Sequence, residues 1–196
     1  MAKRPSFLLF LFVIFFSYQV FASYDRILHG RYGAIYGDYR GPTSGNFFVP
    51  TMLDLETEWF ITSKRSLVLR FMMAVDVESA KNYYTYAGSG MRFSLDTHGT
   101  LVEESEKNFS ISSIPRWRTY WGWDLGFSQV LVKSLGSVLQ VVSTLADFGA
   151  CVGTVYQIDR RVGLEAQLSG SFGYGFSSVS VLGQSLRLVV GATYYF

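Results

Sequence analysis

Apolar and polar residues alternate with a period of two along most of the chain after Ser23. Successive side chains of a β-strand point to opposite faces, so this period predicts strands. The alternating segments are about 11–14 residues long. That length exceeds the roughly 5–6 residues of a globular strand and suits the roughly 9–11 residues of a tilted strand that crosses a bilayer. We therefore expect eight strands, at residues 27–38, 51–61, 66–77, 83–95, 116–129, 145–157, 161–173 and 184–196.

Charged residues gather on one face of these predicted strands. The other face is apolar, as Leu67, Leu69 and Phe71 show in the third segment. This separation indicates that each strand divides two different environments. The charged residues assigned to the polar face are Arg31, Asp54, Glu56, Glu58, Arg70, Asp76, Arg92, Arg118, Asp124, Asp147, Glu165 and Arg187.

Glycine indicates which of the two faces points inward. A soluble barrel would also alternate, but with its charges in water. Glycine inside a strand usually marks a close approach, and long Arg and Glu side chains in a narrow tube need neighbours that leave room. The charged face is therefore expected to line the lumen and the apolar face to meet lipid. The glycines that share the charged face are Gly33, Gly37, Gly88, Gly90, Gly122, Gly126, Gly149, Gly153, Gly163 and Gly191.

The expected fold is an all-β, eight-stranded antiparallel up-and-down transmembrane barrel over residues 23–196. Two connections leave alternatives open. Residues 96–115 are long for a turn, and Asp96–Gly99 could close an extra hairpin and give ten strands. Residues 130–144 are apolar for an exposed loop, and could either extend the fifth and sixth strands or form a short helix. Short polar turns at residues 62–65 and 158–160 are expected on the periplasmic side, and the links near 38–46, 77–82, 130–144 and 174–183 outside.

Residues 1–22 have the composition of a signal peptide. Lys3 and Arg4 precede an almost unbroken apolar run, Phe7–Phe16. The run is too short for a membrane-spanning helix, which needs about 20 apolar residues. Small or modest residues follow it at the positions that a signal peptidase reads. We expect cleavage after Ala22, with Val20, Ala22 and Ser23 as the residues around the cut, and therefore export across the inner membrane.

Composition excludes several other classes of protein. The chain has 196 residues, of which 49% are apolar and 17% aromatic, so it is not disordered. A single cysteine excludes a disulfide framework and a cysteine-clustered zinc site. Loss of Lys3 and Arg4 leaves 15 basic residues beside 15 acidic ones. A neutral chain without a concentrated basic face is not expected to bind nucleic acid.

The last predicted strand resembles that of a known family. Apolar or aromatic residues occupy alternate positions up to the C-terminal phenylalanine: Leu188, Val190, Ala192, Tyr194 and Phe196. Together with the signal peptide and the alternating strands, this pattern resembles small bacterial outer-membrane barrels of the OmpA, OmpX and OmpW type. The resemblance implies a Gram-negative outer membrane as the location, and lipid and lipopolysaccharide as the surroundings. It also implies delivery by periplasmic chaperones, recognition of the last strand by the barrel-assembly machinery, and a monomeric barrel.

The inward charges favour a structural role over chemistry. An eight-stranded barrel is just wide enough for side chains to fill, so the arginines and carboxylates are expected to form a buried ion-pair network, with Arg31 and Arg70 beside the acids of the second strand. A narrow pore or a lateral-diffusion transporter for a small or apolar solute is the alternative. A lipid-modifying enzyme is the weakest reading, because only two histidines are present. His29 is expected at the periplasmic end of the first strand, as a packed or hydrogen-bonded residue, and His98 lies in the long connection with no serine at a telling spacing. We expect no enzymatic activity, no cofactor and no metal.

Overall fold

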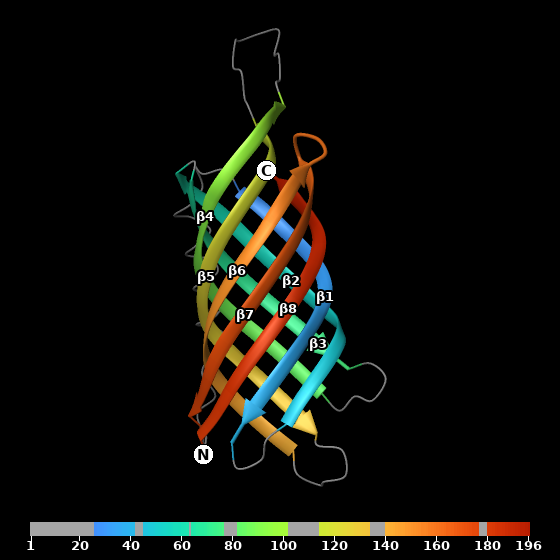
Figure 1. The fold of residues 1–196 in the computed structure, drawn as a ribbon, viewed down its shortest axis with the longest axis vertical. Coiled ribbons are helices and arrows are strands. Elements are labelled where there is room, and N and C mark those ends of the chain that lie inside the picture. Colours follow the sequence, from blue (N-terminus) through green and yellow to red (C-terminus); the bar gives the residue numbers. More distant parts are fainter. Residues whose placement is uncertain are drawn as a thin grey trace.

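The computed structural model describes residues 26–41, 45–62, 64–76, 82–101, 114–133, 140–176 and 180–196. These residues form one closed antiparallel barrel in which each strand pairs with the next and β8 pairs with β1 (Figure 1). The strands are β1 (Arg26–Arg40), β2 (Gly45–Thr62), β3 (Arg65–Val75), β4 (Asn82–Leu101), β5 (Ile114–Lys133), β6 (Gln140–Gln157), β7 (Val162–Phe176) and β8 (Ser180–Tyr195). The predicted fold class and the number of eight strands are confirmed. Within the described ranges, the chain contains no helix long and apolar enough to cross a membrane.

The alternative of ten strands is wrong. Residues 96–101 do not turn back, but continue β4 and pair with residues 114–119 of β5. The pairing of β3 with β4 ends at Arg65 and Phe93, so the last residues of β4 extend past β3. In Figure 1 the paired ends of β4 and β5 rise above the rest of the barrel. The part of the expected 96–115 connection at residues 102–113 lies outside the described residues.

The apolar stretch at residues 130–144 extends two strands. β5 continues to Lys133 and β6 begins at Gln140, and these two residues face each other in the register. Of the two alternatives, the longer hairpin is confirmed for the described part, and residues 134–139 lie outside it. The expected signal peptide, with its cleavage site at Val20, Ala22 and Ser23, also falls on residues that the structure does not describe.

The two ends of the barrel differ. One end, here called the carboxyl end, carries Phe196, the short turns after β2 and β6, and the projecting β4–β5 hairpin. The other, the loop end, is where β1, β3, β5 and β7 finish. The turn after β6 is held by Asp159, whose Oδ1 accepts the backbone N–H groups of Arg161 and Val162 at 2.7 and 2.8 Å. These two donors lower the pKa of the Asp159 carboxyl.

The inward face carries the predicted charges. Eleven of the twelve are buried in the lumen, and Asp76, which follows β3, is only half-buried. Large apolar side chains stand on the outward face, with Leu188 60% exposed to the surroundings. Two residues depart from the expected pattern. Trp59 is on the outward face but almost covered, and Asp38 lies on the apolar face of β1, where the Arg40 Nε donates to its Oδ2 at 3.1 Å.

The lumen also contains an apolar section, which the sequence reading missed. It lies toward the loop end and is built from inward side chains such as Ile35, Met52, Met72 and Val189. These residues share the inward parity of the charges, and parity alone does not show that they gather in one section of the lumen. The full apolar section is Ile35, Tyr39, Phe47, Val49, Met52, Met72, Ala74, Tyr84, Tyr86, Val130, Leu145, Val181 and Val189.

Inward glycines make room for the charged side chains, as expected. Gly191 lies between Arg31 and Glu165 in the register of β1, β8 and β7. A Cβ atom at Gly191 would meet the Gly30 carbonyl oxygen and would lie 2.9 Å from the Arg31 Cγ. Real Cβ atoms almost never approach other atoms so closely. The absence of a side chain at this position therefore allows Arg31 to reach across β8 to Glu165.

Replacing Gly191 with alanine tests this role of glycine. We expect Gly191→Ala to destabilise the barrel by about 1–3 kcal/mol, because the added methyl group overpacks the lumen wall. Gly30→Ala is the matched control, since a Cβ there meets nothing within 4 Å. The measurement is the midpoint of urea unfolding in lipid vesicles. Equal midpoints for the two variants would contradict the assignment of the glycine-rich face to the lumen.

Candidate functional site

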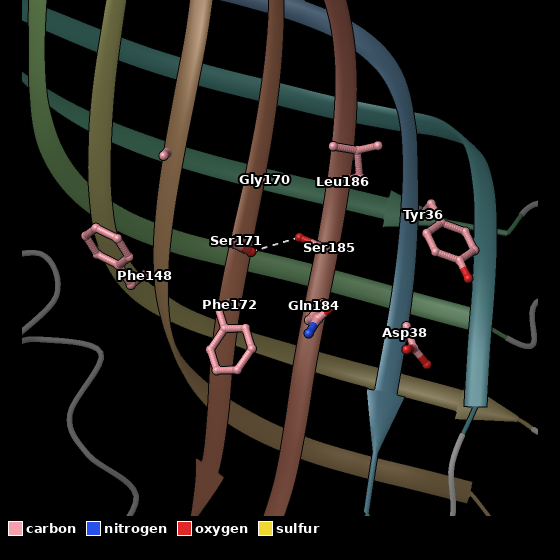
Figure 2. A pocket seen from close by; sticks show the side chains of 10 residues that line it. Tyr36, Asp38, Phe148, Gly170, Ser171, Phe172, Gln184, Ser185 and Leu186 are labelled. Carbon is pink, nitrogen blue, oxygen red and sulfur yellow. Dashed lines mark hydrogen bonds between the residues drawn. The ribbon is translucent and has the colours of Figure 1, made fainter.

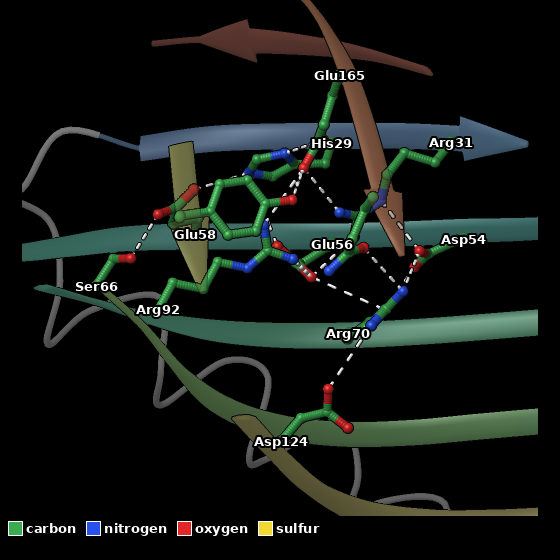
Figure 3. Close-up of polar contacts among 12 residues, drawn as sticks. His29, Arg31, Asp54, Glu56, Glu58, Ser66, Arg70, Arg92, Asp124 and Glu165 are labelled. Carbon is green, nitrogen blue, oxygen red and sulfur yellow. Dashed lines mark hydrogen bonds and ion pairs between the residues drawn. The ribbon is translucent and has the colours of Figure 1, made fainter. Parts of the chain in front are cut away.

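The charged part of the lumen, here called the polar section, is the candidate site. The register places opposite charges side by side: Arg31 of β1 faces Asp54 of β2, and Glu56 of β2 faces Arg70 of β3. Figure 3 shows these side chains converging from several strands. The polar section consists of His29, Arg31, Asp54, Glu56, Glu58, Ser66, Arg70, Arg92, Arg118, Tyr120, Asp124, Glu165 and Gln167.

Arg31 is at the centre of this section. Its Nε lies 3.0 Å from the Asp54 Oδ2, its Nη2 2.8 Å from the Glu56 Oε2, and its Nη1 3.0 Å from the Glu165 Oε1. All four side chains are fully or almost fully buried. A single guanidinium thus joins β1 to β2 on one side and to β7 on the other. An arginine can do this because its planar group offers five donors in a fixed fork.

Arg70 and Arg118 each hold one carboxylate with two bonds. Arg70 contacts the two oxygens of Asp54 at 3.0 and 2.6 Å, and Arg118 contacts those of Glu58 at 2.9 and 2.7 Å. Arg31 and Arg70, the expected partners of the acids of the second strand, both lie within ion-pair distance of Asp54 and Glu56. Glu58 has other partners, because Arg118 reaches it across the lumen from β5.

His29, expected as a packed or hydrogen-bonded residue near the start of the first strand, belongs to the same network. Its Nδ1 lies 2.7 Å from the Glu165 Oε2, and its Nε2 lies 3.0 Å from the Glu58 Oε2. An ionised carboxylate only accepts hydrogen bonds, so both ring nitrogens must donate. This is the geometry of an imidazolium. Its position two residues before Arg31 is the signal that could have identified it as inward.

Hydroxyl groups complete the network. The Tyr120 hydroxyl donates to Glu165, and the Tyr86 hydroxyl, at the border of the apolar section, donates to Asp124. The Ser66 hydroxyl donates to Glu58, and the Arg92 guanidinium, which binds Glu56, lies over the ring of Tyr120 at 4.3 Å. Arg92 was among the predicted charges, whereas the uncharged Tyr86, Tyr120 and Ser66 were not. Their inward parity is the signal that could have identified them.

Three predicted members stand apart from the polar section. Asp76 follows β3 and lies outside the strands, and Asp147 and Arg187 lie toward the apolar section. Arg187 is fully buried but makes no ion pair with a carboxylate in the described part of the chain. Its Nη1 lies 3.4 Å from the Met72 Sδ, and its guanidinium lies 5.7 Å from the Tyr86 ring. The twelve charges therefore share the lumen but not one network.

The buried charges balance in number. Among the described residues, five arginines and His29 as an imidazolium face six buried carboxylates, namely Asp54, Glu56, Glu58, Asp124, Asp147 and Glu165. A buried charge without compensation is strongly unfavourable. The balance lets a protein carry this many ionised groups away from water.

The side chains of the polar section pack against one another. The residues around His29 are almost completely buried. No group of His, Cys, Asp and Glu in the described ranges is arranged to hold a metal ion. The backbone of His98 continues β4, and its side chain lies outside those described.

The predicted assembly residues lie along β8 on the outward face of the barrel. Leu188, Val190, Ala192 and Tyr194 point outward from β8. Phe196 follows the strand at the carboxyl end, and its exposed ring packs edge-on against that of Tyr194 at 5.0 Å. The structure thus brings these five residues into one outward row.

Comparison with known proteins shows a likeness of fold. No protein-family model matches the chain, and no curated protein sequence matches it. The crystal structure of neisserial surface protein A is similar, with 15% identity, a TM-score of 0.61, and coverage of 87% of this chain and 97% of that one. The N-terminal barrel of OprF from Pseudomonas aeruginosa has 13% identity and a TM-score of 0.48, with coverage of 87% and 97%. The Ail protein of Yersinia pestis has 14% identity and a TM-score of 0.46, with coverage of 88% and 99%. The chain shares the barrel fold of neisserial surface protein A.

Two arginines of different environment test the network. We expect Arg31→Met to destabilise the barrel by about 3–5 kcal/mol, because three buried carboxylates lose a partner. Arg187→Met should cost clearly less, since that arginine makes no ion pair and already packs against Met72. Urea unfolding in vesicles measures both. A smaller loss for Arg31→Met than for Arg187→Met would contradict the network as the stabilising feature.

Proposed function

We propose that the chain is an integral outer-membrane protein of a Gram-negative bacterium, with a filled lumen and a structural or surface-interaction role. One observation supports this above all: the wall is apolar outside and charged inside. Leu188, Val190 and Leu125 are each more than half exposed on the outward face, while Arg31 and Arg70 are buried within. Such a wall would be unfavourable in water. It matches what a bilayer requires, because a closed barrel satisfies all its backbone groups internally.

Side chains of the described residues fill both sections of the lumen. The polar section fills one part of the barrel, and the apolar section fills the part toward the loop end. Arg31, Arg70, Met52 and Ile35 are all fully or almost fully buried. This filling disfavours a narrow pore, and the continuous pairing of all eight strands disfavours lateral passage through the wall. The buried position of His29 likewise disfavours an enzyme.

The proposal includes a route to the membrane and an orientation. Residues 1–22 would direct export, and the outward row that ends at Phe196 would present β8 to the barrel-assembly machinery after delivery by periplasmic chaperones. The carboxyl end, with its short turns, would then face the periplasm and the loop end the outside. Lipid and lipopolysaccharide would surround a monomeric barrel. Contacts with the cell's surroundings would be made at the loop end.

Reconstitution into planar bilayers tests the filled lumen. We expect no reproducible single-channel steps at either polarity, because side chains occupy both sections. A porin of 16 strands, reconstituted in parallel, serves as the positive control, since barrels of that size enclose an aqueous channel. Reproducible steps from the purified chain would favour the narrow-pore alternative.

Cell fractionation tests the location. We expect the processed chain to begin at Ser23 and to remain with the outer-membrane fraction after washes with alkaline carbonate and with 4 M urea (on the order of the concentrations that strip peripheral proteins). Detergent should release it, because the apolar wall needs an amphiphile in water. Recovery of the processed chain in the soluble periplasmic fraction without detergent would overturn the proposal.

A further inference from the structure

A groove of about 580 Å³ lies on the outward face, across β6, β7, β8 and β1 toward the loop end (Figure 2). Its floor has almost no side chains, since Ala150 and Gly170 face each other there in the register of β6 and β7. Phe148 and Phe172 stand beside this floor as a second pair, displaced toward the loop end. The groove is thus a hollow left by two small residues in a wall of large ones.

The same two rows continue onto β8 and β1 with different chemistry. The row of Ala150 and Gly170 continues with Leu186 and Tyr36, which are apolar and half-exposed. The row of the two phenylalanines continues with Gln184 of β8 and Asp38 of β1. The groove is therefore apolar over its floor and polar at one corner. That corner lies nearer the loop end than the floor does.

Arg40 adds a positive charge beyond this corner. It is the next outward position after Asp38 on β1, and 69% of its side chain is exposed. Its Nε and Nη2 both lie 3.1 Å from the Asp38 Oδ2. A guanidinium carries five N–H donors, and its planar fork matches the geometry of a phosphate group. Asp38 also restricts the position of this guanidinium.

The wall behind the groove is closed. Ser171 and Ser185 point inward behind the floor, and their hydroxyl oxygens lie 2.8 Å apart across the β7–β8 pair. The backbone pairing of these two strands runs without a break from Val162 to Phe176. A molecule in the groove would therefore rest on the outside of the barrel. It would not be on a path into the lumen.

We infer that this groove binds one phosphate-bearing membrane lipid. An acyl chain lies over Gly170 and Ala150, between the phenylalanine pair and Leu186, and the phosphate of the headgroup bonds to Arg40, with Gln184 beside it. This inference rests on the proposed function, which places the outward face in lipid. The change from an apolar floor to a charged corner along the groove parallels the change from acyl chain to headgroup along a lipid. That match is the reason for choosing a lipid over a protein as the occupant.

The experiment fills the groove with a large side chain at Gly170 and compares this variant with the same substitution at another outward glycine. The variant is Gly170→Phe, and a side chain fits there because a Cβ would have only the Ser185 carbonyl oxygen near it, at 3.6 Å. Gly30→Phe is the matched control, since Gly30 also faces outward on a strand and lies outside the groove. Dioleoylphosphatidylglycerol is titrated into detergent micelles of the full chain. Native mass spectrometry then counts the bound lipids, and a heat-dependent shift in gel migration verifies that each variant is folded.

We expect one tightly held lipid on the original chain and on Gly30→Phe, and at least tenfold weaker binding to Gly170→Phe. Arg40→Gln should weaken binding of the phosphatidylglycerol severalfold without changing the binding of dioleoylglycerol, which lacks the phosphate. Equal lipid binding by Gly170→Phe and Gly30→Phe would overturn the groove as the site. Equal binding of the two lipids would overturn the role of the phosphate. Cell fractionation separates the two proposals. If only the lipid site is wrong, the chain is still recovered in the outer-membrane fraction; if the proposed function is wrong, it is not.

Discussion

The neutralisation of Arg31 by three carboxylates is the interaction on which the barrel depends. The bonds of its guanidinium to Asp54 and Glu56 join β1 to its neighbour β2, and the bond to Glu165 reaches across β8 to β7, which is far from β1 in sequence. A buried charge is tolerated only where partners surround it. The network therefore forms only when the barrel has closed and brought Glu165 next to Arg31. Closure and charge compensation are in this sense one event.

The same requirement explains the composition of the inward face. Side chains of opposite charge can meet only where the strands between them leave room, so glycine takes positions such as Gly191. Toward the loop end, inward residues such as Ile35 and Met72 fill the lumen without needing partners. The polar section determines which strands pair, because ion pairs are directional. The apolar section adds packing whose energy depends less on the exact orientation of the side chains. A lumen with both sections can be specific and full at the same time.

Much of the fold and of the lumen lining was predictable, because the side chains of a strand alternate between two faces with a period of two residues. Parity identified the eight strands, the lumen face, and eleven charges that are buried there. It could not pair Glu58 with Arg118, since partners across a lumen depend on tilt and on side-chain length. The extension of β4 past Leu95 was missed because the bulge between Ser94 and Asp96 interrupts the alternation. His29 and Tyr120 were within reach of the method, and were missed because the search considered only residues with a formal charge.

The groove could not be predicted from the sequence at all, because it depends on the register of four strands. Ala150 and Gly170 become one floor only when β6 pairs with β7, and Asp38 joins Gln184 only when β1 pairs with β8. In this barrel, described side chains of the polar and apolar sections occupy the lumen. We therefore place the proposed ligand site on the outer wall. Small residues on that wall, among large apolar ones, are the positions where such a site can form.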